Sequence, residues 1–268
     1  MAGYQSTDFR IYDETMTTAR ADSLDSPHSP HSPHARFFAL IPCAGQGSRA
    51  GAPLAKQYQL IAGQALVRHT LAAFAAVKRL DKTLVVVAPG DCFFGEPALN
   101  QAFEVADCGG TSRAGSVRNG LQALKKRGAL DDDWVLVHDA ARCLISPRQI
   151  DRLIDVCAGD EVGGLLALKL PDTLKREADG RVAGTVERAD KWLAQTPQMF
   201  RLGALFEALH EAGEGITDES SAMEARGLQP KLVAGSAENF KVTYAEDFWL
   251  AEAILLGRRN RLNRQTTP

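Results

Sequence analysis

A glycine-rich loop with two cations is the stretch whose residue types are best suited to chemistry. The apolar run FFALI at 37–41 leads directly into the sequence PCAGQGSRAGAPLAK, which ends at Lys56. Gly45 and Gly47 lack a Cβ, so the backbone there can turn tightly and its N–H groups can approach a phosphate. Arg49 and Lys56 add full positive charges beside these partial ones. The stretch predicts an anion-binding loop at the end of a buried strand.

The spacing of the glycines separates this loop from two common phosphate-binding loops. The third glycine, Gly51, follows Gly45 by six residues, whereas a dinucleotide-binding fingerprint requires a shorter spacing. No Gly-Lys-Ser/Thr sequence follows, which excludes a Walker A loop. On the glycines alone, an ordinary strand-to-helix turn rich in small residues is an equal alternative.

A second glycine-rich segment, GGTSRAGSVRNG at 109–120, follows an expected strand and opens an expected helix. The N-terminus of such a helix offers unpaired N–H groups and the positive end of the helix dipole. Arg113 and Ser116 could hold a base or a phosphate there. Ordinary helix capping explains the same residues equally well.

The motif VHDAAR places Asp139 directly after another expected strand. A carboxylate in this position can hold a hydrated Mg²⁺ on substrate phosphates, and it can equally cap a helix, so both interpretations stay open. His138 is interpreted as a core histidine rather than a base. Two glycine segments, scattered cations and one or two acids, without a candidate Ser-His-Asp or Cys-His set, indicate phosphoryl or nucleotidyl transfer. Such reactions depend on positioning and charge neutralisation more than on a protein nucleophile.

The composition of the 268-residue chain is ordinary for a globular protein. The net charge is −2, and residues 1–35 hold five acids against two arginines, so the remainder is close to neutral. This balance argues against nucleic acid as the main partner, because phosphate-backbone binding leaves a basic footprint. The five cysteines are scattered without a CxxC pair, which predicts reduced thiols rather than a disulfide framework or a zinc site. Because no apolar run suits a membrane span and no signal-peptide pattern is found, we expect a cytoplasmic protein with no membrane partner.

From residue 37 onward, apolar runs of strand length alternate with segments of helical period. This alternation predicts an α/β fold with a mostly parallel sheet and helices on both faces. Ligands in such sheets bind at the carboxyl ends of the strands, where both glycine segments and Asp139 would meet. The expected strands are 37–41, 84–88, 103–106, 135–138 and 165–168.

Two of the expected helices have explicit start signals. Ser146 serves as an N-cap with Pro147 at the first helical position. Thr243 and Glu246 match a capping box for the last helix, and the polar residues after Gly257 are expected to fray. The other helices are expected to begin near Leu66, Val117, Leu202 and Thr217.

One polar segment, TLKREADGRVAGTVER at 173–188, interrupts the alternation. Its strand-like flanks surround Asp179-Gly180, which is a strong turn signal for a β-hairpin. An isolated hairpin is only marginally stable in water, so we expect this one to pack on a second subunit. The predicted organisation is a disordered Ser/Pro/His tail at 1–35, a folded domain at 36–258 with the hairpin arm at about 170–195, and a frayed polar tail at 259–268.

Seven sequence blocks, in this order, resemble one family, the 2-C-methyl-D-erythritol 4-phosphate cytidylyltransferases of the non-mevalonate isoprenoid pathway. The resemblance covers residues 37–256 and implies a Rossmann-like nucleotidyltransferase fold, so that 36–258 would be a cytidylyltransferase domain with a hairpin dimerisation arm. The relatives of this family that act on sugar or ribitol phosphates begin the first loop with LAGG, whereas this chain has PCAG. The blocks are PCAGQGSR, KQY, GGTSRAGSVRNGL, VHDAAR, QTPQMF, TDESSAME and NFKVT.

The resemblance implies that a phosphate oxygen of methylerythritol phosphate attacks the α-phosphorus of CTP and releases pyrophosphate. This nucleophile is already ionised at neutral pH, so no general base is required. Arg49 and Lys56 match the positions that stabilise the transition state in the family. Lys241 and Arg188 match the positions that hold the substrate phosphate.

The resemblance also implies how substrates, metal and subunits are arranged. Gly110 and Ser116 would recognise cytosine, and Asp139 would lie near Mg²⁺ and the substrate hydroxyls. The arm would reach across a homodimer, so that Arg188 and Thr196 complete the site of the neighbouring subunit. The further positions expected to bind substrate are Ala44, Gly45, Gly47, Arg113, Arg142 and Thr217.

Three positions depart from the family pattern. Cys43 and Cys143 stand where alanine and proline are usual, and Ala55 replaces a proline. A thiol in the first loop could crowd the backbone or make the enzyme sensitive to oxidation. From the length of 268 residues, we expect that this is not the fused form of the enzyme that carries a cyclase domain. Two alternatives stay open, namely a cytidylyltransferase for another polyol phosphate such as ribitol 5-phosphate, and a silent CTP-binding homologue.

Overall fold

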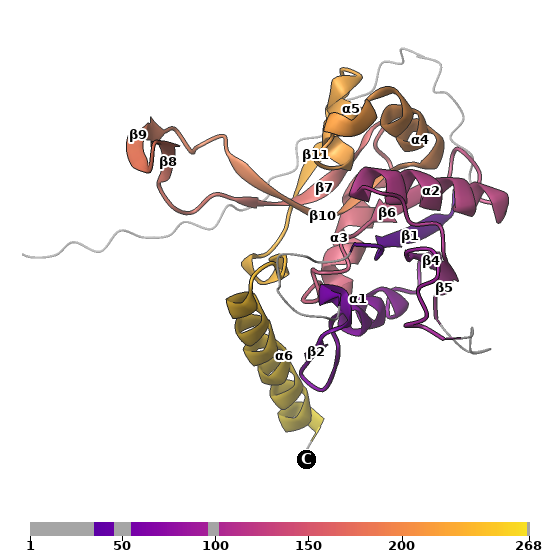
Figure 1. Ribbon diagram of the computed structural model, residues 1–268, viewed down its shortest axis with the longest axis horizontal. Coiled ribbons are helices and arrows are strands. Elements are labelled where there is room, and N and C mark those ends of the chain that lie inside the picture. Colours follow the sequence, from indigo (N-terminus) through magenta and orange to yellow (C-terminus); the bar gives the residue numbers. More distant parts are fainter. Residues whose placement is uncertain (1–34, 46–54, 96–101, 267–268) are drawn as a thin grey trace, which may run out of the picture. The chain divides into compact units, whose positions relative to one another are not determined.

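The computed structural model describes residues 35–45, 55–95 and 102–266 (Figure 1). The expected disordered tail and the first-loop residues Gly47, Arg49 and Gly51 lie outside these ranges. Residues Cys43 to Gly45 and Ala55 onward frame the first loop on both sides. The structure therefore places the loop's ends but not its centre.

A seven-stranded sheet forms the core, in the order β11-β7-β10-β6-β1-β4-β5. Strand β1 pairs in parallel with β4 and β6, β4 with β5, and β7 with β11, whereas β10 runs antiparallel to both β6 and β7. The prediction of a mostly parallel sheet is confirmed. The strands are β1 (Phe37–Pro42), β4 (Leu80–Val86), β5 (Glu104–Ala106), β6 (Trp134–Val137), β7 (Gly163–Lys169), β10 (Trp192–Arg201) and β11 (Lys231–Ala234).

Two of these strands, β10 and β11, were not expected from the sequence. Strand β10 carries Gln195, Thr196 and Gln198 in buried positions, so its polar residues conceal the apolar run by which strands are recognised. Strand β11 has four residues and exposes Leu232. Strand β4 also begins four residues before the predicted start, at Leu80, because its first residues are partly or fully exposed.

Helices cover both faces of the sheet (Figure 1). Along β1, Ala39 and Ile41 point into a core shared with α1 and α3, and Phe38 and Leu40 point into a core shared with α2, α4 and α5. Alternating sides are what the two-residue period of a strand requires. The helices are α1 (Leu66–Ala75), α2 (Arg113–Lys126), α3 (Pro147–Cys157), α4 (Leu202–Glu211), α5 (Glu219–Ala225) and α6 (Ala245–Thr266).

A third apolar cluster packs α6 against the segment after β6. It contains Ala251 of α6, Leu144 of the segment after β6 and Val242, which precedes α6. None of the helices in the described ranges is long and apolar enough to cross a membrane. The remaining elements are η2 (Lys56–Tyr58), the small ribbon of β2 (Leu60–Ile61) and β3 (Gln64–Ala65), η3 (Gly213–Gly215) and η4 (Ala237–Asn239).

The predicted start of α3 is confirmed, whereas the predicted cap and the predicted end of α6 are wrong. Ser146 caps α3 in a capping box with Gln149, and Pro147 is the first helical residue. At α6, the Thr243 hydroxyl donates to the carbonyl of Lys241, so it is not the cap. The Asp247 carboxylate instead accepts from the N–H groups of Thr243 and Tyr244 at 2.7 and 2.8 Å.

The residues after Gly257 continue α6 to Thr266 rather than form a frayed tail. A single glycine costs a helix only about 1 kcal/mol. The segment that follows, RRNRLNRQT, contains Arg, Leu and Gln, which favour helix more than glycine does. The predicted end of the folded chain was therefore too early.

The predicted hairpin is formed by β8 (Leu174–Ala178) and β9 (Arg181–Val186). The turn residues Asp179 and Gly180 have φ of 51° and 73°, as a tight type I′ hairpin turn requires. The hairpin is a separate two-stranded sheet beyond the ends of β7 and β10 (Figure 1). Its side chains are largely exposed, including Val182 at 68 %.

Candidate active site

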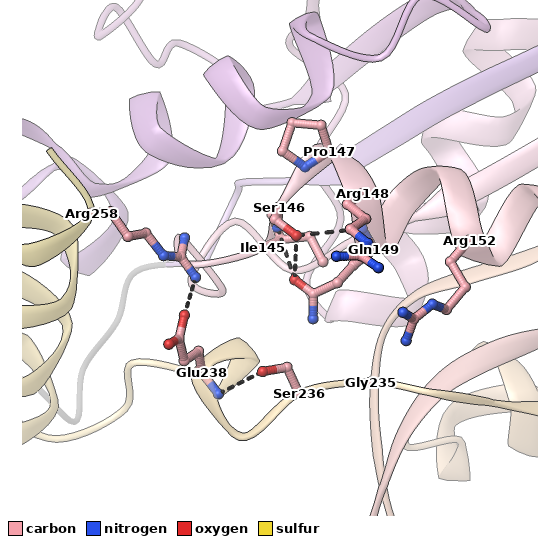
Figure 2. Close-up of a pocket in the computed structure, with 10 residues that line it drawn as sticks. All are labelled: Ile145, Ser146, Pro147, Arg148, Gln149, Arg152, Gly235, Ser236, Glu238 and Arg258. Carbon is pink, nitrogen blue, oxygen red and sulfur yellow. Dashed lines mark hydrogen bonds and ion pairs between the residues drawn. The ribbon is translucent and has the colours of Figure 1, made fainter. Parts of the chain in front are cut away.

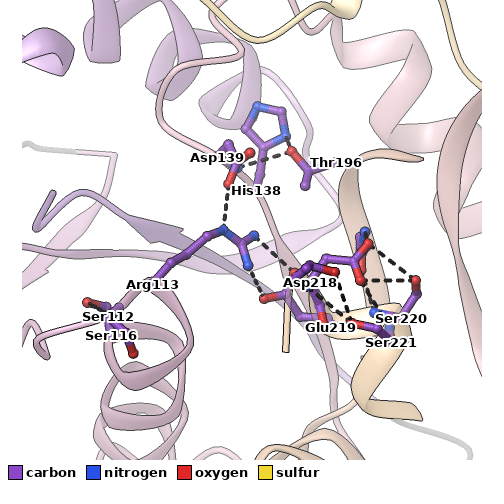
Figure 3. Close-up of polar contacts among 12 residues, drawn as sticks. Ser112, Arg113, Ser116, His138, Asp139, Thr196, Asp218, Glu219, Ser220 and Ser221 are labelled. Carbon is purple, nitrogen blue, oxygen red and sulfur yellow. Dashed lines mark hydrogen bonds and ion pairs between the residues drawn. The ribbon is translucent and has the colours of Figure 1, made fainter. Parts of the chain in front are cut away.

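Asp139 lies at the centre of a group of cations next to the carboxyl end of β6. Its Oδ1 accepts a hydrogen bond from Arg113 Nε at 2.7 Å, and its Oδ2 lies 2.9 Å from Lys241 Nζ (Figure 3 shows Arg113 and Asp139). Arg142 Nε lies 3.7 Å from the same Oδ2. The structure thus brings together four predicted site residues from α2, from the segment after β6 and from the segment before α6.

The charges around Asp139 decide its ionisation. Burial by itself would raise the pKa of Asp139, but the positive charges of Arg113 and Lys241 outweigh it and hold the pKa well below its usual range. The carboxylate is therefore ionised at neutral pH. With three cations close to it, the site retains an excess of positive charge that suits a polyanionic substrate.

Glu219, the first residue of α5, is a member of this cluster that sequence reasoning missed. It is completely buried, and its two oxygens accept from Arg113 Nη1 and Nη2 at 2.7 and 3.0 Å (Figure 3). Burial lowers the pKa of Arg113, but the charges of Glu219 and Asp139 raise it above its usual value overall. The signal in the sequence was an acid in the first turn of a helix, which normally indicates only a favourable helix-dipole contact.

Thr196 and His138 lie next to Asp139 and are linked to its backbone by a chain of hydrogen bonds. Thr196 Oγ1 accepts the Asp139 backbone N–H at 3.1 Å and lies 3.0 Å from His138 Nδ1, while His138 Nε2 lies 3.2 Å from the Arg142 carbonyl (Figure 3 shows the first two contacts). Burial lowers the pKa of His138 to about 3, so its ring is neutral at pH 7. The interpretation of His138 as a satisfied core histidine is confirmed.

Thr196 lies beside Asp139 of its own chain, and the expectation that it completes the site of a neighbouring subunit stays a prediction. Its side chain is buried, at 4 % exposure, against His138 and Asp139 of its own chain. The reason is that β10 returns to the sheet centre between β6 and β7 before residue 196. Thr196 is thus part of the sheet rather than of the arm.

Arg188 lies apart from the Asp139 cluster in this chain. It follows β9 at the end of the arm, is exposed, and donates from Nη1 to the carbonyl of Pro171 at the other side of the arm. The expectation that Arg188 serves a second subunit stays a prediction.

Lys56 and Gln57, in η2, connect the end of the first loop to two other segments, the one that follows Lys241 and the beginning of the loop itself. Lys56 Nζ donates to the carbonyl of Val242 at 2.5 Å, one residue beyond Lys241. Gln57 Nε2 donates to the carbonyls of Cys43 and Gly45 at 2.9 and 2.8 Å. The sequence predicted no role for Gln57, which belongs to the KQY block. In the structure it holds residues 43–45, where the first loop begins.

The second glycine segment forms the start of α2, beside the first loop. Ser116 Oγ accepts the Gly110 N–H at 3.0 Å and donates to the carbonyl of Ser112, the N-cap residue, at 2.9 Å. A Cβ on Gly109 would lie 2.3 Å from Ala44 Cβ. Glycine at 109 is therefore what allows the two loops to approach, and Ala44, Gly110 and Ser116 lie in neighbouring segments as predicted.

Hydrogen bonds from β10 and Arg142 hold the segment that carries Lys241. Gln195 Nε2 donates to the carbonyl of Ser236 at 2.8 Å, and Asn239 Nδ2 donates to the carbonyl of Thr196 at 2.9 Å. Arg142 Nη1 donates to the carbonyl of Asn239 at 2.7 Å. These contacts give a physical reason for the QTPQ and NFKVT blocks.

Thr217 is the predicted site residue with the weakest link to the cluster. It is exposed, and its Oγ1 lies 3.4 Å from Ser221 Oγ. It precedes Asp218, the N-cap of α5. Thr217 is therefore two residues from Glu219, which contacts Arg113 directly.

An open cavity of about 580 Å³ lies at the start of α3, on segments next to the cluster (Figure 2). None of the predicted site residues within the described ranges lines it. Arg258 crosses it to pair with Glu238 and also donates to the carbonyl of Leu144. Its lining consists of Ile145, Ser146, Pro147, Arg148, Gln149, Arg152, Gly235, Ser236, Glu238 and Arg258.

The two unusual cysteines near the site are buried. Cys43 and Cys143 are each 2 % exposed, and burial raises the pKa of their thiols to about 12 and about 11. Because the thiolate is the reactive form, the expected sensitivity to oxidation finds no support at these positions. Ala55 packs its small side chain against the core on the α1 side of the sheet.

Comparison with known proteins identifies the family. The family described as IspD, 2-C-methyl-D-erythritol 4-phosphate cytidylyltransferase, matches residues 37–257. A protein of that name from Paraburkholderia phytofirmans is 55 % identical, over 82 % of this chain and 96 % of its own length. The Bifunctional enzyme IspD/IspF of Albidiferax ferrireducens is 70 % identical over 83 % of this chain, which spans only about half, 54 %, of that longer protein.

Solved structures agree with the sequence comparison. A crystal structure of 4-diphosphocytidyl-2C-methyl-D-erythritol synthase superposes with a TM-score of 0.73 at 38 % identity, covering 83 % of this chain and 99 % of that one. The 2-C-methyl-D-erythritol 4-phosphate cytidylyltransferase of Francisella tularensis gives 0.69 at 32 % identity, covering 81 % and 98 %. The α/β nucleotidyltransferase fold implied by the resemblance is confirmed. The chain belongs to the 2-C-methyl-D-erythritol 4-phosphate cytidylyltransferase family.

Proposed function

We propose that the protein transfers CMP from CTP to 2-C-methyl-D-erythritol 4-phosphate. The products are 4-diphosphocytidyl-2-C-methyl-D-erythritol and pyrophosphate, and the reaction belongs to isoprenoid precursor biosynthesis. Beside the family match, the single observation that carries the proposal is the Asp139 cluster. One ionised carboxylate, Asp139, lies with Arg113, Arg142 and Lys241 next to the carboxyl end of a parallel strand, and Arg113 belongs to the second glycine segment. This is where an α/β sheet binds nucleotides.

The chemistry requires charge stabilisation and no general base. The acceptor phosphate is ionised at neutral pH, and the histidine nearest to the cluster, His138, is buried and neutral with both ring nitrogens near partners. Charge that gathers on the α-phosphorus in the transition state would be met by Lys56 and by Arg49. Preorganised cations of this kind are the usual means of catalysis in phosphoryl transfer.

The roles that we propose in substrate recognition rest on the resemblance to the family. Gly110 and Ser116 would hold the cytosine base, with Ala44, Gly45 and Gly47 along the triphosphate. Lys241, and Arg188 from a second subunit, would hold the acceptor phosphate, and Asp139 would face its hydroxyls. We further propose a cytoplasmic homodimer in which each arm completes the site of its partner.

Mg²⁺ fits this site as a substrate-bound ion. The described residues contain no group of three acidic, histidine or cysteine side chains that could cage a metal, and Mg²⁺ is usually held by one or two carboxylates together with substrate phosphates. Asp139 is the residue that would hold it, after Lys241 Nζ leaves Oδ2 for the substrate phosphate. When bound, the ion neutralises phosphate charge.

Pyrophosphate release from CTP and Mg²⁺ tests the proposal. We expect release with methylerythritol phosphate and none with ribitol 5-phosphate or without an acceptor. Release with ribitol 5-phosphate alone would keep the fold and refute the acceptor. No release with either acceptor, despite measurable CTP binding, would favour a silent CTP-binding homologue.

A further inference from the structure

We propose that Glu219 is a positioning residue for the reaction, which acts by holding Arg113 and, through it, the carboxylate of Asp139. The inference rests on the proposed function, because its readout is the turnover of that reaction. Neither the sequence blocks nor the fold assigns a role to this side chain. Its hydrogen bonds to Arg113 indicate one.

The first argument is the geometry of the chain of ion pairs. Glu219 accepts from both Nη atoms of Arg113, which leaves Arg113 Nε directed at Asp139 Oδ1 at 2.7 Å (Figure 3). A bidentate pair between a carboxylate and a guanidinium fixes the plane of the guanidinium group. Because Nε lies in that plane, Glu219 determines where Asp139 Oδ1 is held.

The second argument is charge. Asp139 binds Arg113 through one oxygen and Lys241 through the other. Without Glu219, the guanidinium group of Arg113 would pair with Asp139 alone or rotate toward the substrate phosphates. Glu219 neutralises Arg113 and so leaves Asp139 Oδ2 available to Lys241, which we expect to move between Asp139 and substrate.

The third argument is that Glu219 is itself rigidly mounted. Asp218, the preceding residue, caps α5 and accepts from Gln198 Nε2 of β10 at 2.8 Å. Gln198 Oε1 accepts the Ser220 N–H at 2.7 Å. The start of α5 is thus bound to the strand that also carries Thr196, the hydrogen-bond partner of the Asp139 backbone.

A purely structural role is the alternative, since a buried carboxylate that loses its partner destabilises a protein. The two roles differ in what they change. A structural role reduces the fraction of folded enzyme, whereas a positioning role reduces the turnover number of enzyme that is folded. The experiment must therefore report turnover per folded molecule.

The test compares Glu219→Gln and Glu219→Asp with the wild type and with Glu224→Gln. Gln keeps the size of the side chain and removes its charge, while Asp keeps the charge on a shorter side chain. Glu224 lies on the same short helix and is exposed, so it is the matched control. Pyrophosphate release is measured as kcat and KM for each substrate, well below the unfolding temperature, with the folded fraction taken from circular dichroism.

We expect Glu219→Gln to lower kcat by about 10- to 100-fold, the cost of a displacement near 1 Å at a reacting centre. The KM for CTP should change less than about threefold, because Glu219 contacts the second glycine segment through the Arg113 side chain and not through Gly110 or Ser116, which would hold the cytosine. Glu219→Asp should recover part of kcat but not all of it, and Glu224→Gln should match the wild type. If Glu219→Gln does not fold, Glu219→Asp carries the test.

A double-mutant cycle with Arg113→Met tests whether Glu219 acts through Arg113. In that case adding Glu219→Gln to Arg113→Met should reduce kcat by no more than about twofold further, because the shared pathway is already broken. Fully multiplicative losses would overturn the inference. So would wild-type kcat per folded molecule in both Glu219 variants. An inactive wild-type enzyme would instead refute the proposed function, and this inference with it.

Discussion

The amine of Lys56 reaches the residue next to Lys241, although the two lysines lie 185 positions apart in the sequence. Lys56 donates to the carbonyl of Val242, and Lys241 pairs with Asp139. Each amine is held by an oxygen atom of the protein, from which we expect it to move to a phosphate oxygen of the substrate. At the scale of single residues, the site is a set of cations held in position by oxygen atoms.

Lys56→Ala should lower kcat by about 10²- to 10³-fold, the usual effect of removing one preorganised transition-state charge. Steady-state pyrophosphate release measures it, and Lys78→Ala, at an exposed position after α1, is the control that should leave kcat unchanged. A kcat close to wild type for Lys56→Ala would assign the stabilising charge to another residue.

At the scale of elements, glycines show where the fold needs the absence of a side chain. Gly163, at the start of β7, has a φ of 105°, and a Cβ there would lie 2.2 Å from the carbonyl oxygen of Met199. Gly257 lies within α6 with no atom within 4 Å of such a Cβ. One substitution is therefore expected to have opposite effects at the two positions.

Gly163→Ala should destabilise the protein by at least about 2 kcal/mol, because backbone strain and a backbone clash combine. Gly257→Ala should stabilise it by about 0.5–1 kcal/mol, the helix propensity of alanine over glycine. Urea unfolding curves of the two variants measure both, and each is the control for the other. Destabilisation by Gly257→Ala would contradict a helix that continues to Thr266.

At the scale of the whole molecule, the arm is the element whose role a single chain does not explain. Its two strands make a sheet of their own, and Arg188 at its end contacts only the arm among the hydrogen bonds found in the described residues. An exposed two-stranded ribbon is marginally stable in water. A second copy of the chain is the partner that would give both the ribbon and Arg188 a role.

Mixing Lys56→Ala and Arg188→Ala chains tests this arrangement. Each variant alone should be nearly inactive. If each arm serves its partner, half of the dimers are hybrids with one intact site, and activity should rise to about one quarter of wild type in a symmetric dimer. Pyrophosphate release after subunit exchange, confirmed with differently tagged chains, measures it. Absence of recovery after confirmed exchange would mean that the arm serves its own subunit.

The sequence alone determined those features that depend on neighbours in the chain. The alternation of apolar strands and helices predicted the parallel sheet, Asp179-Gly180 predicted the hairpin, and Ser146-Pro147 predicted the start of α3. The order of the sequence blocks also identified the family, which the comparisons confirm. The turn, cap and periodicity signals are local, because they act over a few residues, whereas the family is identified by the order of blocks along most of the chain.

The tertiary structure alone decided which polar groups meet. Glu219 lies 106 positions from Arg113 in the sequence, and no local pattern indicates that a first-turn acid will be buried against it. Strand β10 was concealed because its polar side chains Gln198 and Gln195 are satisfied by partners distant in the sequence, Asp218 and Asn239. The same return of β10 to the sheet centre placed Thr196 beside Asp139 of its own chain. Long-range pairing of buried polar groups is a property of the packed fold, since only burial makes an unpaired polar group costly.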